Sequence, residues 1–298
     1  MNVYRTINPT ELPAPKLQGL LQGAVAPRPV AFVSTIDADG KVNLSPFSFF
    51  NLFSANPPIL VFSPARRVRD NTTKHSLENV LEVPECTINI VSYDMVYQMS
   101  LASTEYEKGV NEFTKAGFGE QASELVRPPR VAGAPVQFEC KVVEVKALGT
   151  EGGAGNLVIC EVLRMHIREN ILNEAGSIDP MKIDQVARLG GDWYSRASAG
   201  LFEVEKPLVT KGIGVDALPE SVRLSNILTG NDLGRLGNIE KLPTAEAREA
   251  VMHDAEVQEA YRRFSLHQES LEDHLHNLAH AWIAQNRVAD ALALLMGS

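Results

Sequence analysis

Through the first two thirds of the chain, apolar residues either alternate with polar ones or form short blocks, and this pattern predicts β-strands. Residues 30–36 are rich in β-branched side chains and run into the turn sequence Asp-Ala-Asp-Gly, so residues 30–44 are expected to form a hairpin. Further blocks predict strands at residues 59–63, 86–92, 137–146 and 157–167. Several strands with few helices favour a small antiparallel barrel, because closure of the sheet removes its exposed edges.

The same region carries finer signals. Residues 137–146 alternate apolar with charged side chains, which predicts one buried face and one solvated face, with Glu139 on the solvated one. The glycine-rich residues 152–155 separate two strand blocks and predict a hairpin turn. Helical segments are fewer here, with candidates at residues 71–83, which begin with polar Asn-Thr-Thr, and at residues 94–103.

The pattern changes after residue 200. Residues 200–243 are rich in Gly and Pro and predict an irregular extension with short strands. From Thr244, a plausible N-cap, to Gln285 no Gly or Pro intervenes, which predicts one long helix followed by a short one at 288–296. Its apolar positions follow a heptad stripe that must be buried against a partner surface: Val257, Tyr261, Phe264, Leu271, Leu275, Leu278 and Trp282, with Gln268 at the one missing step. The predicted parts are a barrel domain at 1–200, the irregular extension at 201–243 and a helical segment at 244–298.

Composition narrows the function classes. The chain has 298 residues, 44% of them hydrophobic, and a net charge of −9, which argues against a general binder of nucleic acid or of anionic membranes, since both need a positive field. No apolar run approaches the ~18–20 residues that span a bilayer, and the first residues lack the features of a secretory signal. Cys86, Cys140 and Cys160 lie in apolar runs without Cys-x-x-Cys spacing. We therefore expect buried, reduced thiols and a cytoplasmic protein.

The first candidate for chemistry is NLSPFSFFN, residues 43–51, which interleaves hydroxyl and amide groups with phenylalanines. A large heteroaromatic ligand with polar edges needs this mixture of flat apolar surface and hydrogen-bonding groups. The alternative interpretation is a serine-capped turn whose phenylalanines belong to the core.

The second candidate is SPARRVRDNTTKHS, residues 63–76, which carries four cations and several hydroxyl groups just before an expected helix. Guanidinium forks, hydroxyls and a helix N-terminus together favour a phosphate site. The alternative is a solvated basic loop.

Other catalytic and metal signatures are missing from the sequence. There is no Ser-His-Asp pattern, nucleophile elbow, Walker-type phosphate loop or Gly-rich dinucleotide fingerprint. His276 and His280 have the i, i+4 spacing of a metal-binding helix, but the residues between them lack the glutamate of a metalloprotease. We interpret the pair as a solvated helix face and predict no metal site.

An ordered set of short motifs resembles the flavin reductase-like, FMN-binding split-barrel family, in the branch with flavoredoxin and the reductases of two-component monooxygenases. The motifs are Arg28-Pro29-Val30, residues 43–51, Pro57-Pro58, Phe62-Ser63, Lys74-His75-Ser76 with Asn79, Thr87-Ile88-Asn89-Ile90, residues 155–167, Ala187-Arg188-Leu189-Gly190-Gly191 and Tyr194. His75 and Ser76 replace the Asp and Thr that are usual in the family. The resemblance covers roughly residues 20–200.

The resemblance implies a homodimer of split barrels with FMN near the subunit interface. Its phosphate would be held by Ser63, Arg66, Arg67, Lys74 and Ser76. Contacts to the ring system or ribityl chain would come from Asn43, Ser45, Ser48 and Phe49. His166 would lie beside the flavin as a catalytic candidate, and Tyr194 would close the pocket.

The function expected from this resemblance is an NAD(P)H-dependent flavin reductase. NADH or NADPH would pass hydride to barrel-bound FMN, and electrons would continue to free flavin, a partner monooxygenase or another acceptor. Two alternatives remain open at this stage. One is an FMN electron carrier without nicotinamide turnover, and the other is a helix-mediated scaffold on an inactive barrel.

Overall fold

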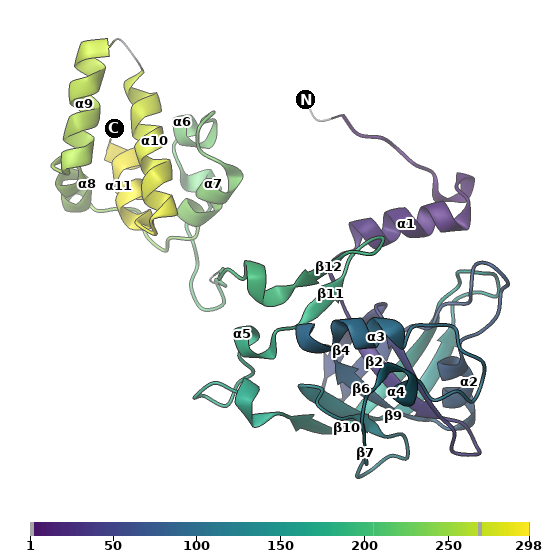
Figure 1. Cartoon of the computed structure of the whole chain (residues 1–298). Helices are drawn as coiled ribbons and strands as arrows, with labels where there is room; N and C mark the ends of the chain where they lie inside the picture. The colour runs from purple at the N-terminus through teal and green to yellow at the C-terminus, as the bar shows by residue number, and fades with distance from the viewer. Residues whose placement is uncertain (1–2, 205, 268–269, 298) are drawn as a thin grey trace. The chain divides into compact units, whose positions relative to one another are not determined.

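The computed structural model describes residues 3–204, 206–267 and 270–297. The chain divides into two compact units, Met1–Phe202 and Glu203–Ser298. We call the first the barrel unit and the second the helical unit; Figure 1 draws them in purple to teal and in green to yellow.

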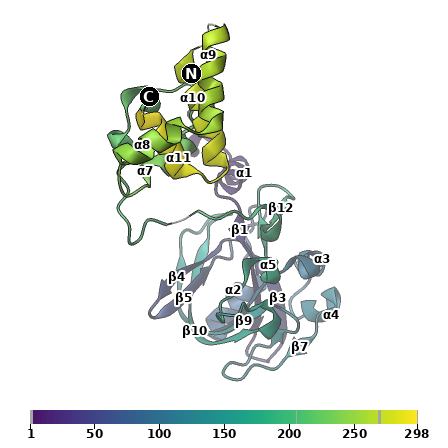
Figure 2. The same ribbon diagram turned by 90° about the vertical axis from the view of Figure 1, so that its left-hand side faces the viewer.

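The barrel unit is built on one seven-stranded antiparallel sheet with the strand order β3-β2-β6-β9-β10-β5-β4. Its strands are β2 (Ala31–Ile36), β3 (Val42–Phe47), β4 (Phe50–Ala55), β5 (Pro58–Phe62), β6 (Glu85–Ile90), β9 (Val136–Ala147) and β10 (Asn156–Ile167). β4, β5 and β10 lie side by side at one end of this order (Figure 2). All five strand blocks expected from the sequence are therefore confirmed, as is the hairpin of β2 and β3.

The two edge strands of this sheet, β3 and β4, are neighbours in the chain, separated only by Ser48 and Phe49. Such a short connection forces the sheet to curl until its edges approach each other. The edges do not pair with each other, so the barrel stays open along this line, which we call the seam.

Two features of the seam differ from the sequence prediction. The pattern placed the end of the second strand at Leu44, but β3 continues through Pro46 to Phe47. Proline is tolerated there because an edge strand has one side without ladder hydrogen bonds. β4 was not predicted, because FNLFSA has no strict alternation and both Leu52 and Phe53 are exposed.

Shorter elements complete the barrel unit. The helices are α1 (Ala14–Ala24), α2 (His75–Glu82), α3 (Val96–Leu101), α4 (Glu112–Ala116) and α5 (Pro180–Ile183). A small sheet has the order β1 (Arg28–Pro29), β11 (Val186–Arg188), β12 (Tyr194–Arg196), and a two-stranded ladder joins β7 (Glu120–Gln121) to β8 (Arg130–Val131). Single 3-10 turns lie at Pro9–Glu11, Tyr93–Met95, Glu169–Ile171 and Ala197–Gly200.

The barrel interior contains the three cysteines, all free and fully buried, as predicted. Cys86 and Cys140 are paired across β6 and β9, and the sulfur of Cys86 lies 3.8 Å from that of Cys160. They pack with Phe62 and Ile88 in one apolar cluster.

The helix expected at 71–83 starts later than predicted, at His75. Asn71 has a φ of 57°, in the left-handed region, so it cannot belong to a helix. Thr72 and Thr73 instead accept hydrogen bonds from the guanidinium of Arg67. The helix expected at 94–103 is present as the turn Tyr93–Met95 followed by α3.

The helical unit contains a 3-10 turn at Val215–Ala217 and the helices α6 (Glu220–Arg223), α7 (Gly230–Gly237), α8 (Ala245–Met252), α9 (Ala255–His267), α10 (Leu271–Ala284) and α11 (Val288–Gly297). Residues 203–204 and 206–243 include no strand, so the short strands expected there were wrong.

The single long helix predicted after Thr244 was also wrong. The chain breaks between α8 and α9, where the Asp254 side chain accepts the N–H of Glu256 and restarts the helix. α10 begins again at the N-cap Ser270, and Gln268 lies outside the described residues. The helix is thus interrupted by a side-chain cap at Asp254, although no Gly or Pro stands at the break.

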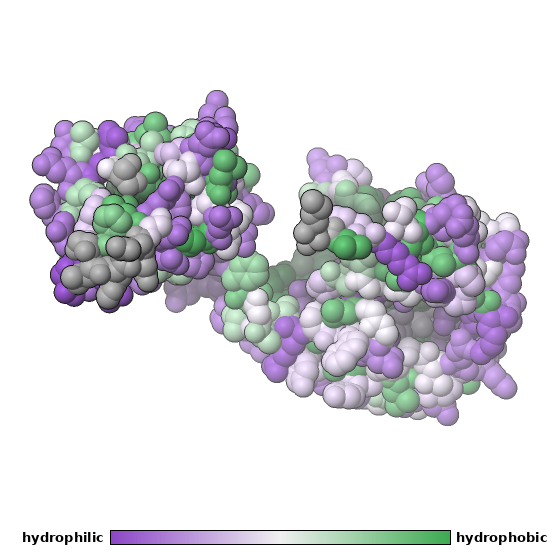
Figure 3. Space-filling view, turned by 90° about the horizontal axis from the view of Figure 1, so that it is seen from above, coloured by the Kyte–Doolittle hydropathy of each residue, from purple (hydrophilic) through white to green (hydrophobic). Residues whose placement is uncertain are grey.

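Most heptad positions are buried or partly buried within the helical unit itself, whereas Phe264 is 42% exposed. Val257, Leu275 and Trp282 are almost fully buried in a core that also includes Leu236 and Leu292. Hydrophilic residues predominate on the face of this unit seen in Figure 3. Apart from Phe264, the described part of the apolar stripe is therefore covered by the helical unit's own core. Among the described residues, no helix is both long and apolar enough to cross a membrane.

Gly212, near the start of the helical unit, packs closely against the C-terminal end of α7. A Cβ on Gly212 would lie 2.8 Å from the Cα of Asn238, where backbone hydrogen bonds link residues 213–214 to 237–239. We expect Gly212→Ala to lower the free energy of unfolding by about 1–3 kcal/mol, because the clash is with backbone. Gly234→Ala in α7 meets no atom within 4 Å and is the control, expected to be neutral or stabilising. Equal thermal unfolding of the two variants would contradict this reading.

Candidate functional site

The loop after β5, residues 63–74, which we call the arginine loop, takes its shape from the turn between β9 and β10. Two backbone hydrogen bonds join them, from Arg66 N to Ala154 O (2.8 Å) and from Gly153 N to Arg66 O (2.9 Å). A Cβ on Gly152 would lie 3.1 Å from backbone atoms of the loop, so a side chain there would push the two segments apart. The predicted hairpin turn at residues 152–155 is confirmed, and its backbone hydrogen bonds to Arg66 hold the arginine loop in shape.

The side chain of Arg66 forms hydrogen bonds within the arginine loop. Its Nε donates to the side-chain oxygen of Asn71 at 2.6 Å, and a terminal nitrogen donates to the Asn71 carbonyl at 2.7 Å. The Asn71 amide in turn donates to Thr150 O at 3.0 Å, in the same β9–β10 connection. Arg66 therefore stabilises the left-handed turn of the loop.

Three cations of the loop converge on one carboxylate, Glu105. The nearest nitrogens of Arg67, Arg69 and Lys74 lie 3.0, 3.0 and 4.0 Å from its oxygens. Burial, assisted by the charge of Arg67, lowers the pKa of Lys74. Asp70, within the loop, also lies 3.1 Å from Arg69, so the four cations of this positively charged loop have both Glu105 and Asp70 as counter-ions.

Ser63, at the start of the loop, has a buried hydroxyl with no hydrogen-bond partner within the described residues. A Cβ on Gly155 would lie 2.7 Å from this oxygen, so the glycine keeps the space beside it open. Asn156 adjoins it and donates its amide to Pro64 O at 3.0 Å. A buried hydroxyl without a partner is unfavourable by about 1–3 kcal/mol, so its presence here suits a ligand that supplies an acceptor.

Two of the predicted site residues contact each other beneath the loop. The Asn43 amide donates to the hydroxyl of Ser76 at 2.8 Å, and both side chains are buried. In the same layer, Asn79 donates to Thr35 at 3.0 Å. These hydrogen bonds anchor α2 to β2 and β3, so Asn43 and Ser76 support the loop from below.

The seam adjoins the arginine loop. The N–H of Ser63 donates to the carbonyl of Phe49 at 2.8 Å. Phe49 is partly exposed at 37%, and Ser45 and Ser48 are half-buried along the same seam. The guanidinium of Arg28 lies 6.0 Å from the Phe49 ring centre. A partly apolar surface therefore continues from the arginine loop.

Tyr194 belongs to the small sheet. Its ring lies 4.7 Å from the Arg188 guanidinium and packs against the second apolar cluster of the barrel unit, which includes Phe32. Strand register pairs Arg28 with Arg188 and Arg188 with Tyr194, which separates Tyr194 from Arg28 by about 10 Å. Tyr194 is therefore two strands away from Arg28 in the small sheet.

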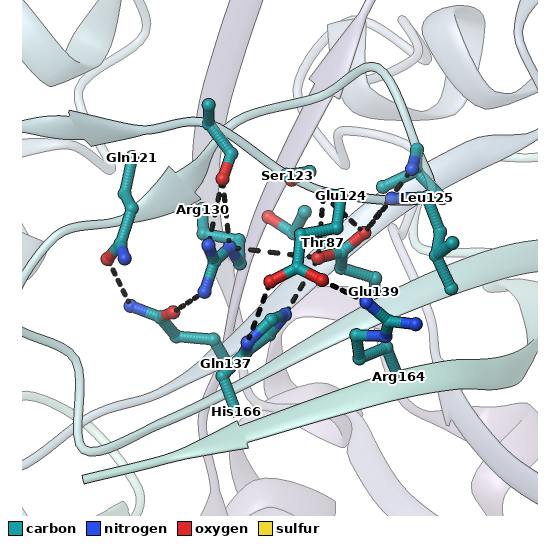
Figure 4. A network of polar contacts seen from close by, with 12 residues as sticks. Thr87, Gln121, Ser123, Glu124, Leu125, Arg130, Gln137, Glu139, Arg164 and His166 are labelled. Atoms are coloured by element: carbon teal, nitrogen blue, oxygen red, sulfur yellow. Dashed lines mark hydrogen bonds and ion pairs between the residues drawn. The ribbon is translucent and has the colours of Figure 1, made fainter.

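His166 belongs to a different polar network, shown in Figure 4. Its Nε2 lies 2.7 Å from the carboxylate of Glu139, which is fully buried and accepts the N–H groups of Glu124 (3.0 Å) and Leu125 (2.6 Å). Burial would raise the pKa of Glu139, but these donors and His166 outweigh it and hold the pKa below its usual range. The predicted solvated position of Glu139 was wrong, because residues 124–126 cover that face of β9.

The structure does not bring His166 together with the arginine loop. Asn156 begins β10 beside Ser63, whereas His166 lies ten residues further along the same strand, about 30 Å of chain. On one chain, His166 and the predicted phosphate residues are thus at opposite ends of β10.

The histidine pair of the helical unit is not the solvated face that was predicted. His276 is buried and its Nδ1 lies 2.9 Å from the Ser225 hydroxyl, which also accepts two backbone N–H groups. His280 lies 2.9 Å from Asp232. The two side chains have different partners, and the described residues include no His, Cys, Asp and Glu cluster of metal-binding type.

Sequence reasoning missed two residues of this site. Glu105 lies in a short polar stretch after α3 that carries no motif, so only its contacts identify it. Asn156 follows the glycine turn at the first position of a strand, which is the one local signal that singles it out.

Known proteins resemble the barrel unit. The family model "Flavin reductase like domain" matches residues 24–182. An uncharacterised protein of Aquifex aeolicus is 37% identical over 181 residues, which is 61% of this chain and 90% of that one. The crystal structure of nitrilotriacetate monooxygenase component B from Bacillus cereus is 29% identical, with a TM-score of 0.64 over 68% of this chain and all of its own. A split barrel domain protein from Shewanella frigidimarina has 25% identity and a TM-score of 0.57, covering 67% of this chain and 95% of its own. These findings confirm the predicted fold.

The Glu139 network generates a stability prediction. We expect Glu139→Gln to lower the free energy of unfolding by about 1–3 kcal/mol, because an amide cannot accept all the N–H groups that the carboxylate accepts. Since the folded pKa is depressed, the carboxylate contribution is present above the unfolded pKa and is lost as pH falls below about 4.

Urea unfolding at pH 7 and at pH 3.5 measures both effects. Exposed Glu144→Gln on the same strand is the control and should leave stability unchanged. The interpretation is wrong if both variants unfold alike.

Proposed function

This chain belongs to the flavin reductase like family, and from that premise we propose that it is an FMN-dependent oxidoreductase that takes hydride from NADH or NADPH. The family and the solved relatives support a flavin cofactor and a flavin reductase type of activity. The electron acceptor would be free flavin, a monooxygenase component or another acceptor.

One observation carries the proposal for the phosphate: the buried hydroxyl of Ser63 beside Gly155, which has no hydrogen-bond partner among the described residues. A phosphate oxygen supplies the acceptor that this hydroxyl lacks. Arg67 and Lys74 lie in the same loop and would offset the charge of about −1.5 to −2 that a phosphate monoester carries near pH 7. Arg66 would act indirectly, by holding the loop in shape.

The ring system would lie along the seam. Ser45 and Ser48 offer hydroxyls to polar ring edges or to the ribityl chain, and Phe49 offers flat apolar surface. Asn43 and Ser76 would position the floor of the site through their mutual hydrogen bond.

The cofactor supplies the hydride-accepting chemistry, so the protein's task is positioning. The half-exposed seam leaves one side of the site open to a nicotinamide. Of the two residues expected beside the flavin, Tyr194 packs against Arg188 in the small sheet, and His166 contacts Glu139. We therefore assign no proton-transfer step to His166 on its own chain.

Two measurements test the proposed function. Purified protein is titrated with FMN, followed by flavin absorption and fluorescence, and the loaded protein is then mixed with NADH or NADPH in a stopped-flow instrument. Flavin binding with bleaching by either donor is expected. Binding without bleaching supports the electron carrier instead, and absence of flavin binding supports a scaffold on an inactive barrel.

Ser63→Ala separates a ligand-binding role from a structural one. FMN affinity is expected to fall about tenfold, as for loss of a hydrogen bond to a charged group, while the stability of the free protein stays equal or rises. Ser34→Ala is the matched control, because Ser34 also has a buried hydroxyl without a partner within the described residues, but inside β2. Equal FMN affinity of the two variants would remove Ser63 from the site.

We also propose a homodimer, supported by the exposed apolar edge strand β4. Leu52 and Phe53 are 61% and 68% exposed, on an edge whose backbone groups lack a neighbouring strand. Light scattering with size-exclusion chromatography is expected to show a dimer that Phe53→Asp converts to a monomer. Leu224→Asp, at an exposed position of the helical unit, should not change the mass. A monomeric wild-type protein would overturn this proposal.

A further inference from the structure

The carboxylate of Glu105 lies at the centre of the cations that the proposed function assigns to a phosphate. Arg67 Nε and Arg69 Nη2 lie 3.0 Å from its two oxygens, and Lys74 Nζ lies 4.0 Å from one of them. These three cations come from one loop, whereas Glu105 comes from the separate connection between α3 and α4.

This connection is held against the arginine loop by a second contact. Lys108 Nζ lies 3.1 Å from a carboxylate oxygen of Glu78 in α2, and the other Glu78 oxygen accepts the hydroxyl hydrogen of Thr73 at 2.7 Å. Glu105 is therefore presented to the cations by a segment that is itself anchored beside the loop.

We propose that Glu105 is an internal competitor for the phosphate of the flavin. When no phosphate is bound, its carboxylate pairs with Arg67 and with Arg69, which Asp70 also contacts, and phosphate binding displaces it. Glu105 would then set how strongly the protein prefers FMN to riboflavin, which has the same ring system without the phosphate. This inference rests on the proposed function.

The contacts of Arg67 favour competition over a positioning role for Glu105. One terminal nitrogen of Arg67 donates to the Thr72 hydroxyl at 2.8 Å and to the Thr73 carbonyl at 2.6 Å. These contacts fix the guanidinium independently of Glu105, so it remains in place when the carboxylate leaves. Lys74 is too far from Glu105 for a hydrogen bond at 4.0 Å, so its ammonium group stays available to a closer anion.

The test compares FMN and riboflavin affinities, by flavin fluorescence, for the full-length wild type, Glu105→Gln and Glu107→Gln. Removing one negative charge beside a phosphate site is expected to tighten FMN binding about fivefold at low salt, and less at high salt. Riboflavin affinity should not change. Glu107 lies in the same connection, is exposed and has no side-chain contact within the described residues, so its variant should behave as wild type.

The outcomes are distinguishable. FMN binding that is unchanged or weaker in Glu105→Gln overturns the competitor role while leaving the proposed function intact. Equal tightening of FMN and riboflavin also overturns it, since riboflavin has no phosphate to compete. A wild-type protein that binds neither flavin overturns the proposed function and this inference together.

Discussion

The two-residue connection between β3 and β4 constrains the whole barrel unit. These strands are the opposite edges of a seven-stranded sheet, so a link of Ser48 and Phe49 alone is possible only when the sheet curls through most of a turn. Because the edges remain unpaired, the barrel has a seam, and the carbonyl of Phe49 accepts the N–H of Ser63 at its end. The arginine loop adjoins the seam because β4 and β5 form a hairpin in which Phe50 pairs with Phe62, so that Phe49 and Ser63 come next on the two strands.

The shape and charge of the arginine loop depend on contacts between segments distant in the chain. The β9–β10 turn forms backbone hydrogen bonds to the loop, and hydrogen bonds anchor α2, which follows the loop, to β2 and β3. The connection after α3 supplies Glu105 as a counter-ion in addition to Asp70. Several like charges within nine residues repel one another unless neighbouring groups neutralise or separate them. A loop organised in this way retains concentrated positive charge on a chain whose net charge is −9.

The helical unit is stabilised by the burial of apolar helix faces in one shared core. Its helices are short, and each carries an apolar face that would be unstable in water alone. Packing α7, α8, α9, α10 and α11 around Trp282 and Leu294 buries these faces together in one core. The family model ends at residue 182, so this unit is an addition to the part of the chain that carries the candidate flavin site.

The amino-acid sequence alone was sufficient to predict the strands of the barrel, the buried cysteines and the motif order typical of the family. Strand formation depends on local apolar pattern and turn residues, which are visible in one dimension. It also located the arginine loop, because four cations in a short stretch are a compositional signal. β4 and the breaks in the C-terminal helix were missed. An exposed edge strand has no regular alternation of apolar and polar residues, and a side-chain cap does not interrupt the helical spacing of apolar residues.

Tertiary structure alone decided what the charged residues do. Glu139 has the sequence position of a solvated residue, yet residues 124–126 cover it and donate their N–H groups to it. Glu105 has no distinguishing neighbours in the chain, yet it meets three cations. His166 shares β10 with the site but lies at its other end. The energy of a charge or of a buried hydroxyl depends on its neighbours in space, and those neighbours come from chain segments whose approach no local pattern specifies.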